Sequence, residues 1–168
     1  ALEAKIGPKG VQLNSINAGG SAAFAWKLAA WGRENDGDGR MQALGRGTVE
    51  QSADQVLVTH GALQEQFSAS SNGLRQDFVI SERPAGTSDL VLRIQTQGAS
   101  LQALDNTDQA VALELDDGRL LHYHALQVTD ANGKPIPAHM QVSAAQTLRI
   151  AVQDQHAQYP LRVDPTFS

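Results

Sequence analysis

Apolar and polar residues alternate along much of this chain, and the alternating runs are short. Clusters of Gly, Asn, Asp and Ser separate the runs, and their recurrence roughly every 8–14 residues is typical of a β-sandwich or barrel. Successive side chains of a strand point to opposite faces of a sheet, so each run can bury one face and leave the other in water. The pattern therefore predicts an all-β fold, an antiparallel β-sandwich-like domain with at most one short helix.

The stretch 21–31 is ambiguous. Its alanines favour a helix by intrinsic propensity, whereas Phe24, Trp26 and Leu28 alternate with smaller or polar residues as they would in a strand. We interpret the stretch as a strand. The other predicted strands cover residues 11–13, 41–44, 48–51, 55–59, 62–68, 74–80, 90–96, 101–104, 110–115, 120–128, 136–142 and 147–152.

Residues that tolerate positive φ mark the turns between these strands. Asn-Gly in particular is typical of a two-residue type I′ hairpin. The closing run predicts a last strand over 159–163, with Asp164-Pro165 marking the exit from the fold. The predicted turns are 34–40, Asn72-Gly73, 116–119, 130–134 and 154–157.

No long Gly/Ser-rich or Pro-rich linker interrupts the chain. We therefore predict a single β-rich module over 1–168. The alternative is a subdivision into two β-subdomains, 1–69 and 70–168, because the Ser and Asn cluster near residue 70 is the clearest break in the pattern.

The composition of the chain excludes several classes of binding partner and of active-site chemistry. The chain has 168 residues, 41% of them hydrophobic, and a formal net charge of -5. Without a basic stripe, a nucleic-acid partner is not expected. The absence of cysteine excludes a disulfide framework, cysteine-ligated zinc and a thiol nucleophile. No run approaches the roughly 20 apolar residues of a membrane span, and no motif implies a cofactor.

His122 and His124 are the candidate metal ligands. They flank Tyr123 in one predicted strand, so both imidazoles point to the same face. Such a dyad needs a third ligand, and the nearest carboxylates in sequence are Glu114, Asp116 and Asp117. The alternative is a polar, solvent-facing strand surface.

Aromatic side chains supply the second candidate site. Trp26, Trp31 and Tyr123, with Tyr159, could form a sugar-stacking platform if they lie together at the surface. In a β-rich chain with only 5% aromatic residues, the alternative is that these rings anchor the core.

Three segments resemble a known bacterial module. They are 72–86 (NGLRQDFVISERPAG), 120–138 (LLHYHALQVTDANGKPIPA) and 159–165 (YPLRVDP). In order and spacing they are similar to the β-rich domain that precedes FG-GAP (integrin-type) or SBBP β-propeller repeats in large secreted or surface bacterial proteins. The motifs are turn glycines, a Pro-Ala-Gly loop and an Asp-Pro pair, so the resemblance implies architecture and location and transfers no catalytic residue.

We therefore expect a non-catalytic structural or adhesive module of an exported bacterial surface protein, at the cell surface or outside the cell. The resemblance implies a downstream β-propeller or repeat domain of the same polypeptide as its partner, which the module caps or spaces. A carbohydrate- or surface-ligand-binding β-sandwich, with a surface glycan or protein as ligand, is the alternative. A metal-dependent enzyme built on His122 and His124 is the third hypothesis.

Overall fold

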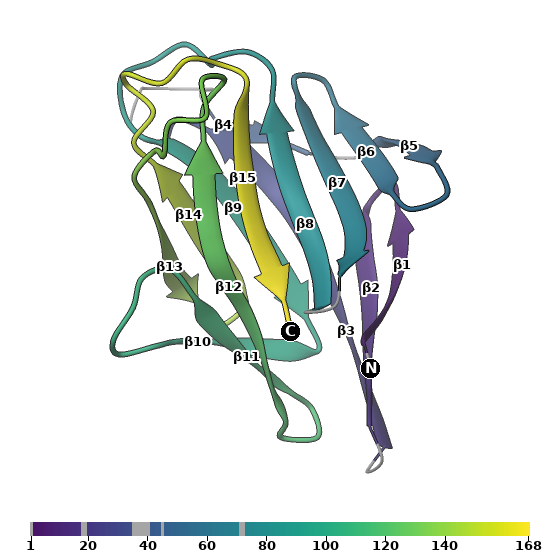
Figure 1. The fold of residues 1–168 in the computed structure, drawn as a ribbon. Helices are drawn as coiled ribbons and strands as arrows, with labels where there is room; N and C mark the ends of the chain where they lie inside the picture. Colours follow the sequence, from purple (N-terminus) through teal and green to yellow (C-terminus); the bar gives the residue numbers. More distant parts are fainter. Residues whose placement is uncertain (1, 18–19, 35–40, 45, 71–72) are drawn as a thin grey trace.

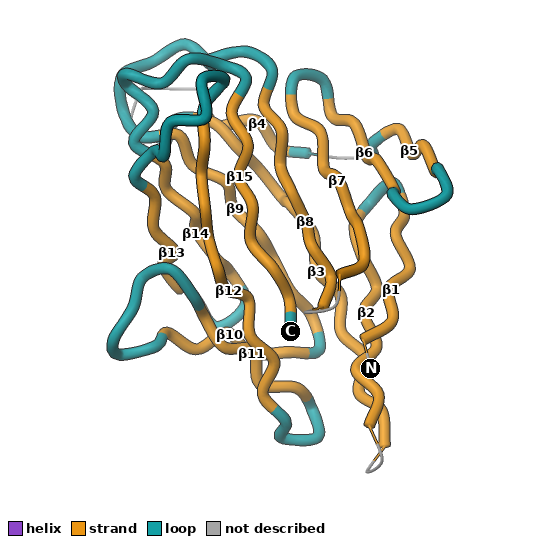
Figure 2. The backbone as a smooth tube through the Cα atoms, viewed as in Figure 1, coloured by secondary structure: helices purple, strands orange, loops and turns teal. Residues whose placement is uncertain are grey.

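Two antiparallel sheets face each other in the computed structural model, which describes residues 2–17, 20–34, 41–44, 46–70 and 73–168 (Figure 1). Every regular element among these residues is a strand, as Figure 2 shows by its colours. The all-β, sandwich-like fold predicted from the alternation is thus confirmed. No helix in the described part of the chain is long and apolar enough to cross a membrane.

The first sheet has 7 strands, in the order β1-β2-β3-β9-β14-β13, with β4 paired to the end of β3. All neighbouring strands of this sheet are antiparallel. The strands are β1 (Leu2–Gly7), β2 (Gly10–Asn17), β3 (Gly20–Gly32), β4 (Met41–Ala43), β9 (Leu90–Gln97), β13 (Ala138–Ala144) and β14 (Thr147–Val152).

The second sheet has 8 strands, in the order β10-β11-β12-β15-β8-β7-β6-β5. Its strands are β5 (Thr48–Gln51), β6 (Val56–His60), β7 (Leu63–Ser70), β8 (Gly73–Ile80), β10 (Ala99–Ala103), β11 (Val111–Leu115), β12 (Leu120–Thr129) and β15 (Leu161–Phe167).

Both sheets take strands from both sides of residue 70. In the first sheet β3 pairs with β9, and in the second β7 pairs with β8. The buried apolar residues of the two sheets also form one cluster. A cut between 69 and 70 would therefore separate paired strands and divide this core.

The ambiguous stretch 21–31 lies within the strand β3, as predicted. Phe24, Trp26 and Leu28 point inward and are buried, while Ala25 and Lys27 face outward. The pairing with β9 shifts between Leu28 and Ala30. Because a bulge inserts one residue, it reverses the alternation, and Trp31 then lies opposite the buried Leu92 and also points inward.

At the ends of the chain one strand was missed and one prediction is wrong. Strand β1 was not predicted, although Leu2, Ala4 and Ile6 alternate there with Glu3 and Lys5. The last strand does not end at Asp164-Pro165 but runs through it to Phe167, between β12 and β8.

A local irregularity explains how proline fits inside this central strand. Proline has no backbone N–H and is confined within sheets to edges and bulges. The register between β12 and β15 shifts between His124 and Gln127, and Ala125 has a φ of 57°. Pro165 is paired in neither flanking ladder, so its missing donor removes no strand hydrogen bond.

The predicted turns that the structure describes are confirmed. Gly118 and Gly133 have φ angles of 84° and 75°, as their hairpin turns require. The Asp154 turn closes through the bond from Ala157 N to Asp154 O, 3.0 Å long. The turn predicted at 34–40 falls mostly on residues outside the described part. Of the predicted Asn72-Gly73 turn, Asn72 lies outside the described residues, whereas Gly73 is the first residue of β8 and pairs with Ser70.

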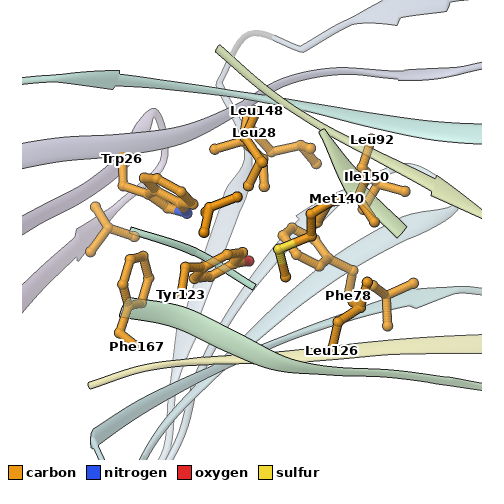
Figure 3. Close-up of a cluster of buried hydrophobic side chains, with 14 of the residues drawn as sticks. Trp26, Leu28, Phe78, Leu92, Tyr123, Leu126, Met140, Leu148, Ile150 and Phe167 are labelled. Carbon is orange, nitrogen blue, oxygen red and sulfur yellow. The ribbon is translucent and has the colours of Figure 1, made fainter. Parts of the chain in front are cut away.

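Three aromatic rings join the sheets at the centre of the core (Figure 3). Trp26 comes from the first sheet, whereas Tyr123 and Phe167 come from the second. The three ring centroids lie 4.7–4.9 Å apart in tilted or edge-on pairs. Such geometries favour aromatic contacts beyond the burial of area alone.

We predict that Gly73→Ala destabilises the fold more than Gly118→Ala does. Both positions have positive φ, which costs an L-residue roughly 1–2 kcal/mol. A Cβ at Gly73 would also lie 1.8 Å from the carbonyl oxygen of Phe167, whereas one at Gly118 meets nothing within 4 Å. Overpacking should therefore add about 1–3 kcal/mol at Gly73 alone. Urea unfolding of both variants measures the difference, and equal losses would contradict the argument.

Candidate functional site

The aromatic residues predicted for a surface platform are not at the surface. The exposed fractions of Trp26, Trp31 and Tyr123 are 0%, 3% and 0%. The Trp26 indole N–H and the Tyr123 hydroxyl both donate to Gln76 Oε1, over 3.1 and 2.9 Å. The polar atoms of Trp26 and Tyr123 are thus satisfied inside the core, whereas the Trp31 indole nitrogen is buried without a hydrogen-bond partner among the described residues. All three rings are buried and act as core anchors.

The two histidines do share one face of β12, as predicted, but they gather no further ligand. His122 is exposed, and His124 Nε2 lies 2.6 Å from Ser168 Oγ. Glu114 instead accepts a hydrogen bond from Gln102. Among the described residues no group of three His, Cys, Asp or Glu side chains could hold a metal ion.

The most buried ion pair in the described part of the chain joins Arg33 and Asp154. The guanidinium donates to both carboxylate oxygens, over 2.6 and 2.9 Å, and the two side chains are 1% and 0% exposed. The same guanidinium donates to the carbonyls of Ser88 and Pro84. This bidentate geometry fixes the 84–88 loop against the turn that follows β14.

Further groups complete this cluster. Tyr159 donates to Asp154 Oδ2 over 2.6 Å, and Arg83 stacks on the Tyr159 ring at 5.0 Å. Burial opposes the ionisation of Asp154, but the bonds from Arg33 and Tyr159 outweigh it and hold the pKa of Asp154 below its ordinary value. The hydrogen bonds of Arg33, Arg83 and Tyr159 in this cluster are directed at carbonyls and a carboxylate of the fold itself, so we assign the cluster a structural role.

A second charged group lies on the outer face of the other sheet. Arg75 bridges Asp164 and Asp77 over 2.8 and 3.3 Å, and Arg162 also donates to Asp77. Burial and the neighbouring Asp77 carboxyl raise the pKa of Asp164 to about 6, although Arg75 opposes them. The Asp164 carboxyl therefore changes charge near pH 6.

The best candidate for a ligand site is a groove on the outer face of the first sheet. Its volume is about 700 Å³, and it runs over β1, β2, β3 and β9 to the start of β14. Its floor is low because Gly7, Gly10 and Ala25 carry little or no side chain. A Cβ at Gly10 would lie 2.7 Å from Lys27 Cβ, so only glycine lets the β1–β2 turn approach β3 this closely.

Positive charge distinguishes the rim of this groove. Lys5, Lys9, Lys27 and Arg46 line it, and no carboxylate does so among the described residues. The strand register places Lys5 opposite Gln12, and Lys27 opposite Gln95. These cations and amides therefore face the same side of the sheet.

A second hollow, of about 760 Å³, lies between the edges of the sheets at β1 and at the β5–β6 turn. Apolar side chains such as Leu2, Ile6 and Phe67 supply much of its lining, together with one carboxylate, Asp54. Its lining residues share neither one sign of charge nor one type of hydrogen-bonding group, so this hollow indicates no ligand class.

Sequence reasoning missed the groove because its lining comes from five separate stretches of the chain. One signal was available: residues 1–33 contain four basic residues but a single acidic one, Glu3, in a chain of net charge -5. No feature of the sequence indicated that Arg33 and Asp154 form an ion pair, because they lie 121 positions apart.

Comparisons of the chain with models of known protein families, with curated proteins and with solved structures found no match. The assignment of a site therefore depends on the geometry above.

We predict that Arg33→Met lowers the free energy of unfolding by about 3–5 kcal/mol, because it leaves a buried carboxylate without its main partner. The matched control is Arg93→Gln. Arg93 is 38% exposed and pairs at 3.4 Å with Glu34, which keeps its bond to Arg149. The control should cost less than about 1 kcal/mol. Urea denaturation of both variants at pH 7 tests this, and similar losses would show that the buried pair contributes little.

We also predict that the Asp164 carboxyl titrates with a midpoint of about 6 rather than the ordinary 3.8. A raised pKa means that folding favours the protonated form, so this contribution to stability is present below pH 3.8 and is lost as the pH rises through 6. Asp164→Asn should flatten this part of the stability profile.

Carbon-13 NMR of the carboxyl groups measures the midpoint directly. Asp117 is an internal reference, because the backbone N–H of Arg119 lowers its pKa. An Asp164 midpoint close to that of Asp117 would contradict the prediction.

Proposed function

We propose that this chain is a non-catalytic structural and adhesive module of an exported bacterial surface protein. In this role it caps or spaces a downstream β-propeller or repeat domain of the same polypeptide and works at the cell surface or outside the cell. The three segments that resemble the propeller-associated module support the location and the partner. The groove supports the adhesive part.

One observation carries the proposal: the groove's rim carries cations that have no carboxylate partner in the described part of the chain. Lysine and arginine side chains remain protonated at neutral pH and act only as hydrogen-bond donors. Proton transfer in catalysis needs a group that can take up and release a proton near the working pH. The described lining includes neither a carboxylate nor an imidazole, so it suits the retention of a ligand better than its conversion.

The carbohydrate- or surface-ligand-binding alternative now depends on this groove instead of on Trp26, Trp31 and Tyr123. It becomes the ligand-binding side of the same proposal. The metal-dependent enzyme remains a weaker candidate, because His122 and His124 contribute only two imidazoles.

The proposal predicts binding without turnover. The purified chain, immobilised on beads, should retain at least one glycan class from a mixed panel of neutral and acidic bacterial polysaccharides. Incubation with added Zn²⁺ or Mg²⁺ should release no new reducing ends. His122→Ala should change neither result, because that side chain lies outside the groove.

Failure to retain any glycan or surface protein would overturn the adhesive function. Metal-dependent chain cleavage that His122→Ala abolishes would overturn the non-catalytic assignment and establish the enzyme hypothesis.

A further inference from the structure

We infer that the groove over β1, β2, β3 and β9 binds an acidic polysaccharide, a chain of sugars carrying carboxylate or sulfate groups. This inference rests on the proposed adhesive function and names its ligand class. It depends on which cations of the protein are already paired, on the amides beside the free ones, and on the shape of the floor.

The arginines of the fold are almost all paired. Among the described residues every arginine except Arg46 lies within 4.0 Å of a carboxylate oxygen. The paired arginines are Arg33, Arg75, Arg83, Arg93, Arg119, Arg149 and Arg162.

The cations of the groove are different. Lys5, Lys9, Lys27 and Arg46 form no ion pair with any carboxylate in the described ranges, and all four line this one hollow. The chain has one other lysine, Lys134, which lies in a turn and helps to lower the pKa of Asp130. In a protein of net charge -5, most of the unpaired positive charge of the described residues is thus gathered where a ligand can reach it, and it selects an anion.

Amide side chains alternate with these cations across the strands. One row of the register runs from Lys5 through Gln12 and Ala25 to Gln97. The next row places Lys27 beside Gln95, which in turn lies opposite Thr147. An amide both donates and accepts hydrogen bonds, as a sugar hydroxyl does. Since neighbouring strands lie about 4.8 Å apart, the rim offers charges and amides at the spacing of groups along a sugar chain.

The absence of an exposed ring in the described lining separates this ligand from single-stranded nucleic acid. Proteins that bind single strands combine cationic grooves with aromatic side chains on which bases stack. The aromatic residue of this groove is Trp26, whose side chain is buried and turned into the core. The surface therefore provides charge and hydrogen bonds without a stacking platform, which suits an acidic sugar chain and not a base.

The test compares polymers that differ in charge. The immobilised native chain is challenged with dextran sulfate, with unsulfated dextran of the same length and with polygalacturonate. We expect retention of one or both acidic polymers and not of dextran. Raising the salt from 0.1 to 1 M should weaken that retention, since it shortens the screening length from about 10 to about 3 Å.

Variants then locate the site. Lys5→Gln and Lys27→Gln should each weaken binding roughly two- to five-fold, and the double variant about ten-fold, as expected for exposed charges. Lys134→Gln is the matched control, because it removes the same charge outside the groove, and it should change binding by less than about two-fold. All three side chains are exposed, so the thermal melting curves should coincide and exclude unfolding as the cause.

The outcomes separate the two proposals. If the double variant binds acidic polymers as well as the native chain does, the groove is not the site, although the adhesive function stands. If the chain retains only neutral dextran or another neutral glycan, the inference of an acidic ligand is wrong, although the adhesive function stands. Equal competition by poly(dT) would overturn the sugar assignment in favour of a general polyanion surface. If the native chain retains none of these polymers, this inference fails. The adhesive function fails as well only if the chain also retains no glycan of the mixed panel and no surface protein.

Discussion

A single buried oxygen atom, Gln76 Oε1, satisfies polar groups from both sheets. It accepts from the Trp26 indole of the first sheet and from the Tyr123 hydroxyl of the second. Each donor left buried without a partner would cost about 1–3 kcal/mol. The amide therefore allows two large amphipathic rings to occupy the centre of an apolar core, and it fixes their positions relative to each other.

The same amide reaches toward the groove through a chain of polar contacts. Gln76 Nε2 donates to Glu65 over 2.9 Å, and Glu65 lies 2.9 Å from His60. The His60 ring packs so closely on Gly47 that an added Cβ would lie 2.7 Å from its Cε1 atom. Gly47 N then donates to the carbonyl of Pro8 in the β1–β2 turn. Core packing thus determines where Gly47 and its neighbour, Arg46, lie beside the groove.

Alternation alone was sufficient to predict most strands, because one face of each is buried and the other is not. It failed where backbone chemistry overrides the pattern. Pro165 marks an end in most sequences, but a bulge opposite it lets β15 continue. The candidate site was less predictable. The sequence around Trp26 and Tyr123 fits a buried core as well as a surface platform. The position of Gln76, which accepts a hydrogen bond from each of them inside the core, distinguishes the two possibilities.

The alanine-rich composition of β3, which made its sequence resemble a helix, has a structural reason. A strand presents both faces with one backbone, so its inward and outward residues are selected separately. Inward, Phe24 and Trp26 fill the space between the sheets. Outward, a larger residue at Ala25 would fill the hollow between Gln12 and Gln97. Ala25, one of the alanines that raise the helix propensity of this stretch, therefore keeps the groove open, and the ambiguity of the sequence arises because the two faces of β3 require side chains of different size.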